Sequence, residues 1–262
     1  MQLDTVQINA QDPRRKALKD GFIQNRGWWA PFWDDFLALD VEMFEAFLEY
    51  GSVAWKKGHL APKVKEFIYV AIDCATTHMY EPGLRIHLRN AFKFGATQEE
   101  IMEVYELVAG MGIHTVSMAV PILMEELRAA GQEVSMVLTP EQQQLKDQYL
   151  AAHGIWAPYL EDFLVLDIEL FRANLHFSSV PLKKAFIEPK IREFILLSVD
   201  AATTHLHQPG VRQHIRNAIQ LGATRNEIME VLELVSILGM HTISMGVPVL
   251  ADELRAVAAA QP

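Results

Sequence analysis

The strongest constraint on the fold of this chain is a duplication within its own sequence. Residues 62–128 align with residues 189–255 without a gap, and 39 of the 67 aligned positions are identical. A constant offset of 127 residues relates the two stretches, and the same offset superimposes the Trp-Ala-Pro triplets that precede them. Because internal repetition of this kind is the signature of two similar structural units, we place one unit at residues 12–138 and the other at residues 139–262.

Both copies carry the sequence signals of helices. Thr97 and Glu100 form a T-x-x-E capping box before an apolar helical stretch, and Thr224 and Glu227 repeat it. No segment alternates polar and apolar residues between turn pairs, as a strand would. We therefore expect an all-α fold, a tandem duplication of one helical unit. The helices expected in the first copy cover residues 13–25, 31–38, 41–56, 62–79, 82–94, 98–111 and 114–130.

The composition limits the classes of partner. The formal net charge is −10, which repels nucleic acid and anionic lipid surfaces. We find no uncharged apolar run near the roughly 20 residues that cross a bilayer, and Met1–Asp4 does not begin a signal peptide. The expectation is a cytoplasmic protein with a small-molecule substrate and no nucleic-acid or membrane partner. The single cysteine, Cys74, excludes an internal disulfide.

An acidic stripe runs along the helix that begins at Pro62. At 100° per residue, Glu66, Asp73 and Thr77 lie close to one line, while the rest of this helix is apolar over most of its girth. At least part of the stripe is therefore expected to be buried or to line a cleft. A buried carboxylate either pairs with another helix in a structural role or takes part in catalysis, and the sequence leaves both possibilities open for Glu66 and its copy Glu193.

A histidine follows on the next helix in each copy. His87, repeated as His214, shares a helix face with apolar residues. A lone histidine in that position is commonly a core residue. A carboxylate and an imidazole from consecutive antiparallel helices can also form a general acid/base couple, so we expect His87 to contact Glu66 and His214 to contact Glu193.

Other basic and imidazole side chains recur in both copies and are candidates for substrate binding. The arginines would clamp a carboxylate, although surface arginines are common on helices. These candidates are Arg85, Arg89, His78 and His114 in the first copy, and Arg212, Arg216, His205 and His241 in the second. No HxxxH spacing places two histidines on one helix face, so we expect no metal site.

At these residues the sequence resembles a known family. The segment that starts at Glu66, passes His87 and continues as A-x-x-x-G-A-T-x-E-E-I is similar to the signature of the carboxymuconolactone decarboxylase and AhpD-like family. The resemblance implies a cofactor-independent lyase that acts on a small carboxylated lactone or a related ring acid. It also implies that Glu66 and His87, with Glu193 and His214, handle the protons.

The resemblance also bears on sulfur chemistry. Family members with peroxidase activity carry a CxxC pair before the histidine, and in register with that histidine the two positions are Tyr80 and Gly83 here, and His207 and Gly210 in the second copy. Both sulfurs are missing, which disfavours an AhpD-like peroxidase as the alternative activity. A non-catalytic ligand-binding or assembly protein is the alternative from another class.

The resemblance further implies a homo-oligomer. Single-unit members assemble as trimers or hexamers, so a trimer of tandem chains is the first expectation and a dimer the alternative. The apolar, Met-rich stretches near 108–124 and 235–250 agree with association, because one small helical unit would not bury them.

Overall fold

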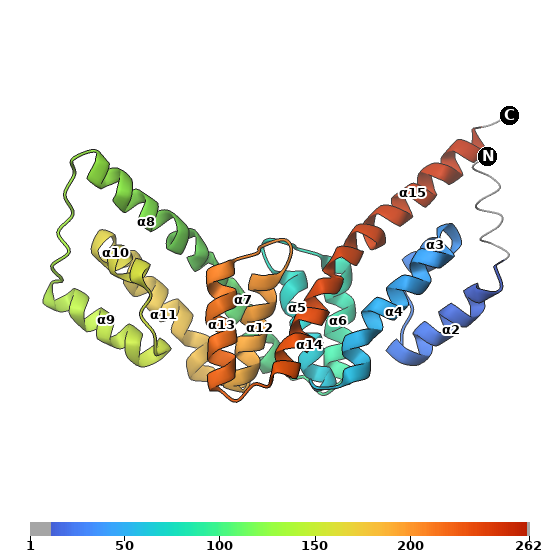
Figure 1. Cartoon of the computed structure of the whole chain (residues 1–262), viewed down its shortest axis with the longest axis horizontal. Helices are drawn as coiled ribbons and strands as arrows, with labels where there is room; N and C mark the ends of the chain where they lie inside the picture. Colours follow the sequence, from blue (N-terminus) through green and yellow to red (C-terminus); the bar gives the residue numbers. More distant parts are fainter. Residues whose placement is uncertain (1–11, 261–262) are drawn as a thin grey trace. The chain divides into compact units, whose positions relative to one another are not determined.

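The computed structural model describes residues 12–260, and every regular element within them is a helix (Figure 1). The expected all-α class is confirmed. The predictions for Met1–Asp4 and for the last two residues of the second copy lie outside the described residues. The first copy contains α2 (Arg14–Arg26), α3 (Phe32–Leu39), α4 (Val41–Lys57), α5 (Pro62–Cys74), α6 (Glu81–Lys93), α7 (Gln98–Ala109), the 3₁₀ turn η1 (Gly110–Gly112) and α8 (Ile113–Ala129). The second contains α9 (Pro140–His153), α10 (Pro158–Leu166), α11 (Ile168–Lys184), α12 (Pro189–Ala201), α13 (Gln208–Gln220), α14 (Arg225–Ser236), the 3₁₀ turn η2 (Ile237–Met240) and α15 (His241–Ala259).

Helix starts are set by side-chain caps. The Thr97 and Thr224 capping boxes are present as expected, with each threonine accepting the backbone N–H of the glutamate three residues later. Asp40 and Asp167 cap α4 and α11 in the same way. These caps satisfy backbone N–H groups that have no partner within the helix.

The helix expected at 62–79 is shorter than the sequence indicated. α5 ends at Cys74, and the chain then turns through Met79, whose φ of 53° is left-handed. The amide of Tyr80 closes the turn by donating to the carbonyl of Asp73 at 2.8 Å. His78 therefore lies in a turn and not at a helix C-terminus. This reversal returns α6 along α5, and these two helices pack closely against each other.

The chain contacts divide the molecule into two compact units that do not follow the sequence copies. One comprises the described residues up to Ala61, together with Ala201–Leu206 and those from Thr224 onward; the other comprises Pro62–Asp200 and His207–Ala223. In the first, α15 packs on α3 and α14 on α4; in the second, α5 packs on α6 and α7, and α8 on α10 (Figure 1). Each unit therefore combines helices of both copies, and the boundaries 12–138 and 139–262 describe the duplication and not these units.

α5 runs through the interior of its unit. Its buried residues are Val64, Lys65, Glu66, Phe67, Ile68, Val70, Ala71, Ile72 and Asp73. Apolar side chains of α6 and α7, such as Ala91, Val104 and Val108, pack against it. Two carboxylates of the predicted acidic stripe are thus carried into an apolar core, where they need partners or a proton.

The expectation that no apolar run could cross a membrane was wrong. Gln98–Ala129 and Arg225–Ala259 each contain an 18-residue window with a mean hydropathy of 1.7, which satisfies the length and composition of a membrane span. Only 22% of each window is buried within the chain. Length and composition alone are weak evidence for a membrane helix, and a 3₁₀ turn, η1 or η2, interrupts each stretch. The two stretches leave apolar surface on α8 and on α15.

Candidate active site

The first Glu–His pair lies between α5 and α6. Glu66 is 1% exposed, and its Oε2 lies 2.7 Å from Nδ1 of His87. Asn90, one turn further along α6, donates to the other carboxylate oxygen at 3.3 Å. The contact expected between His87 and Glu66 is confirmed.

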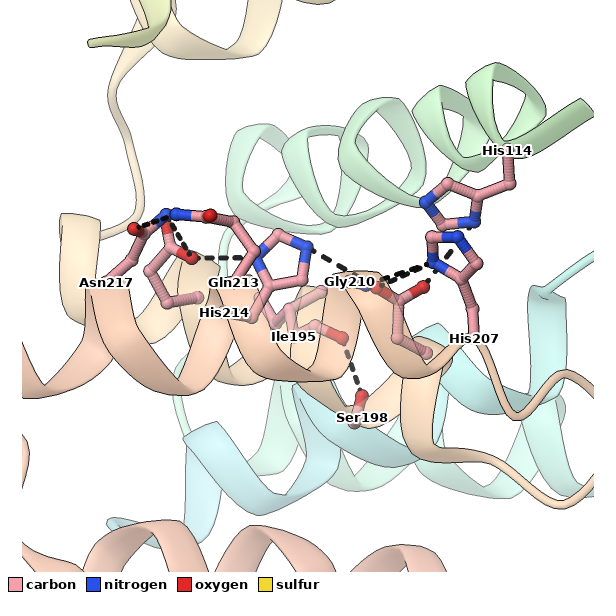
Figure 2. Close-up of polar contacts among 10 residues, drawn as sticks. His114, Ile195, Ser198, His207, Gly210, Gln213, His214 and Asn217 are labelled. Atoms are coloured by element: carbon pink, nitrogen blue, oxygen red, sulfur yellow. Dashed lines mark hydrogen bonds and ion pairs between the residues drawn. The ribbon is translucent and has the colours of Figure 1, made fainter. Parts of the chain in front are cut away.

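The second pair repeats this geometry between α12 and α13. Nδ1 of His214 lies 2.7 Å from Oε2 of Glu193, and Asn217 donates to the same oxygen at 3.2 Å. Figure 2 shows His214 with Asn217 on one side and the Gly210 turn on the other. The side chain of Glu193 is 17% exposed, against 2% for Glu66, so the second carboxylate is the more open of the two.

The pairing fixes which nitrogen of each imidazole is available for chemistry. A glutamate carboxylate only accepts hydrogen bonds, so Nδ1 carries the hydrogen that points at Glu66 or Glu193. The second nitrogen, Nε2, then faces away from the glutamate and is the atom that can take or give a proton. An imidazole oriented by a carboxylate in this way is the arrangement of a general acid/base.

An aspartate lies beside each pair, and the predicted site did not include it. Asp200 is 2% exposed, and its Oδ2 lies 3.5 Å from Nε2 of His214. Burial raises the pKa of Asp200 to about 6, and the charge of His214 partly opposes this. Burial raises the pKa of Asp73 to about 7, against the lowering effect of His87 and with a further rise from Glu66. The signal was present in the sequence as the Glu66–Asp73 stripe, but nothing in the pattern showed that Asp200, the equivalent of Asp73, would lie beside the imidazole of His214.

Two more histidines flank Asp200. Nδ1 of His114 and Nδ1 of His207 each lie 3.6 Å from its carboxylate, and the two rings stack with centroids 3.7 Å apart (Figure 2). Side chains of this kind are common metal ligands. Imidazoles bound to one tetrahedral zinc radiate from it, which places their centroids about 5 Å apart for N–Zn distances of about 2.0–2.1 Å. Nδ1 of His207 also accepts the amide of Gly210 at 3.3 Å. His114, His207 and Asp200 each place one potential ligand atom within 4.8 Å of the others and could therefore hold a metal ion, although the two rings stack here and do not radiate from one point.

Among the remaining candidates, His78 places a ring nitrogen within 4.8 Å of a carboxylate oxygen of Asp73. Arg85 is exposed and pairs with Glu81 on its own helix. The other arginine candidates, Arg89, Arg212 and Arg216, are also exposed. The remaining histidine candidates lie in the turn after α5 (His78), in the turn after α12 (His205) and at the first residue of α15 (His241). A role for these residues in substrate binding stays a prediction.

Comparisons with known proteins find matches to one family. A family model described as the carboxymuconolactone decarboxylase family matches residues 42–119. A protein from Burkholderia xenovorans LB400, provisionally named a gamma-carboxymuconolactone decarboxylase subunit, is 40% identical in sequence to this chain. Its crystal structure at 1.70 Å resolution matches this structure with a TM-score of 0.90. The match covers 94% of this chain and 99% of that chain. No curated protein matches the chain significantly. The identity and nearly complete coverage show that this chain belongs to the carboxymuconolactone decarboxylase family.

Proposed function

We propose that this protein is a cofactor-independent carboxy-lyase that removes CO₂ from a small carboxylated lactone or a related ring acid. The observation that carries the proposal is the Glu–His hydrogen bond of 2.7 Å, which recurs in both copies. Membership of the family supports the reaction class, and the substrate is part of the proposal. We place this activity in the cytoplasm, with a small molecule and no nucleic acid as the partner.

The pairs provide the proton chemistry that such a reaction needs. Loss of CO₂ breaks a C–C bond and leaves its electron pair on the ring as carbanion or dienolate charge, which a proton must then quench. Glu66 or Glu193 holds Nδ1–H of its histidine, so Nε2 of His87 or His214 is the position from which a proton reaches the carbon. The carboxylate also stabilises the imidazolium form when the histidine is charged.

The direct test is an assay of the full chain with γ-carboxymuconolactone and with aromatic ring acids as comparison substrates. Release of CO₂ from the lactone, unchanged after dialysis against a chelator, is the expected result. The double variant His87→Gln/His214→Gln should lose at least about 100-fold in turnover. Asp20→Asn, which changes an exposed carboxylate on α2, is the control and should behave as wild type.

Two results would overturn the proposal. Full CO₂ release by the double histidine variant would remove the pairs from the chemistry. Binding of the lactone acids without turnover would favour the non-catalytic ligand-binding alternative instead.

A further inference from the structure

The first turn of α6 and of α13 leaves room for a carboxylate because it contains a glycine. A Cβ atom added at Gly83 would overlap Oδ2 of Asp73, and one added at Gly210 would overlap Oδ2 of Asp200. Both glycines are helical and buried. Each aspartate oxygen therefore occupies the volume in which any other residue at that position would place its side chain.

The positions of Gly83 and Gly210 correspond to a cysteine position in the thiol-containing members that the sequence resembles. In register with the histidine, Gly83 and Gly210 stand where CxxC-containing members carry the second cysteine. The side chain missing at the glycine is replaced in space by a carboxyl group from the preceding helix, α5 or α12.

The carboxylate of Asp200 lies next to Nε2 of His214, the ring nitrogen that does not contact Glu193. His214 has Glu193 at Nδ1, 2.7 Å away, and Asp200 at Nε2, 3.5 Å away. Since Nδ1 carries a hydrogen, a neutral His214 has no hydrogen on Nε2 and can only accept there. A proton shared between Nε2 and Oδ2 is then the one that can move, and its location depends on Asp200.

We propose that Asp200 is a positioning residue that holds the mobile proton at Nε2 of His214, and that Asp73, its equivalent one repeat earlier, does the same for His87. This role rests on the proposed lyase function. It does not depend on any one substrate, because it concerns the resting protonation of the imidazole.

The proton balance closes without a co-reactant. The aspartic acid passes its proton to Nε2 of the neutral histidine and becomes a carboxylate. The substrate loses CO₂ and keeps the bonding electron pair, and Nε2–H gives its proton to the carbon. A proton from water then restores the aspartic acid, and the hydroxide that is left goes to the solvent. Burial favours the protonated acid between turnovers, in agreement with the raised pKa values of both aspartates.

The test combines a spectroscopic and a kinetic measurement on the full chain. The variants are Asp73→Asn/Asp200→Asn, whose amides keep the shape but cannot transfer a proton, and Ser198→Ala as the control. Ser198 is fully buried on α12 near Asp200, and its hydroxyl donates to the carbonyl of Ile195 (Figure 2). Circular dichroism checks the fold of each variant, and Asp200→Asn alone, observed at His214, gives the same comparison if the double variant does not fold.

We expect ¹⁵N NMR of His87 and His214 to show a partly protonated Nε2 in the wild type and in Ser198→Ala. In the double variant Nε2 should show the shift of an unprotonated nitrogen, while Nδ1 stays protonated. With γ-carboxymuconolactone, kcat should fall at least about 100-fold with KM nearly unchanged.

The outcomes separate this inference from the proposed function. Identical Nε2 signals in wild type and double variant, or an unchanged kcat in an active enzyme, would overturn the role of the aspartates and leave the lyase proposal in place. A changed Nε2 signal in a protein that releases no CO₂ would support the role of the aspartates and remove the lyase proposal.

Discussion

The side chains around His87 and His214 differ, although the Glu–His pair is the same. The ring of Tyr69 stacks on His87 with centroids 4.4 Å apart, and Leu196 is its counterpart in the second copy. Tyr80 of the first copy is replaced by His207 in the second. A phenol ring thus covers the first imidazole, and further imidazoles surround the aspartate beside the second.

Single-site variants can show whether both copies work. Replacement of one carboxylate, as in Glu66→Gln or Glu193→Gln, removes the acceptor for Nδ1–H in that copy only. We expect each single variant to keep the turnover of the other copy and the double variant to lose at least about 100-fold. Steady-state CO₂ release measures this, and complete loss of activity in one single variant would show that only that copy is active.

Cys74 is unsuited to peroxide chemistry. Burial raises the pKa of its thiol to about 12, with a further rise from Asp73, and the thiolate is the reactive form. We expect no peroxide turnover with a dithiol donor, and equal background rates in wild type and Cys74→Ser. Turnover that Cys74→Ser abolishes would contradict this and revive the peroxidase alternative.

The raised pKa of Asp73 also predicts how stability depends on pH. With a folded-state pKa of about 7 against an ordinary value of 3.8, the folded protein holds a proton that the unfolded chain has lost between these values. The stabilisation is complete below about pH 4 and disappears as the pH rises to about 7. The slope from one such group is at most about 1.4 kcal/mol per pH unit.

Urea unfolding between pH 5 and 7.5 checks this linkage. We expect the free energy of unfolding to fall less with rising pH in Asp73→Asn than in the wild type. Parallel curves for the two proteins would show that Asp73 titrates normally in the fold.

At the scale of the helices, Gly210 tests the close approach of α13 to Asp200. Alanine usually stabilises a helix over glycine by about 0.5–1 kcal/mol. We expect that gain for Gly21→Ala in α2, where an added Cβ meets nothing within 4 Å. Gly210→Ala should instead destabilise by about 1–3 kcal/mol, because its Cβ overlaps a buried carboxylate. Chemical denaturation of the two variants gives the comparison, and a stabilised Gly210→Ala would contradict the close approach.

The helices and the Glu–His contacts could be predicted from the sequence because their determinants are local. Capping boxes set helix starts, and a single turn between α5 and α6 determines which faces meet. The end of α5 could not be predicted, since the left-handed Met79 is not a glycine. Nor could the contacts of His114 with Asp200 and His207, which depend on how α8 packs in three dimensions and not on spacing along the chain.

At the scale of the whole molecule, exposed apolar side chains on α8 and α15 predict a surface that another protein chain covers. On α8, Met118, Ile122 and Leu123 are between 47% and 60% exposed. Their counterparts on α15, one repeat later, are Met245, Val249 and Leu250, which are between 51% and 62% exposed. Apolar surfaces of this kind mark association sites on soluble proteins.

We propose that a second and third copy of the chain cover these surfaces in a closed trimer. Light scattering behind a sizing column should give about three times the mass of the 29.6 kDa chain. Met118→Glu/Ile122→Glu should shift the protein toward smaller species, whereas Asp20→Asn should not. A wild-type dimer would favour the alternative assembly, and a monomer at micromolar concentration would rule out any obligate oligomer.

The packing of α15 on α3 also imposes an order on biosynthesis. Arg255 pairs with Asp35 across 220 residues of sequence, so at about 5–20 residues per second the ribosome needs roughly 10–40 s to deliver the partner of α3. During that interval α8 is already available, and its sequence is closely similar to that of α15. We therefore expect a nascent α3 to encounter a helix of similar sequence before its native neighbour, so that the duplication that built the fold also offers a non-native pairing during synthesis.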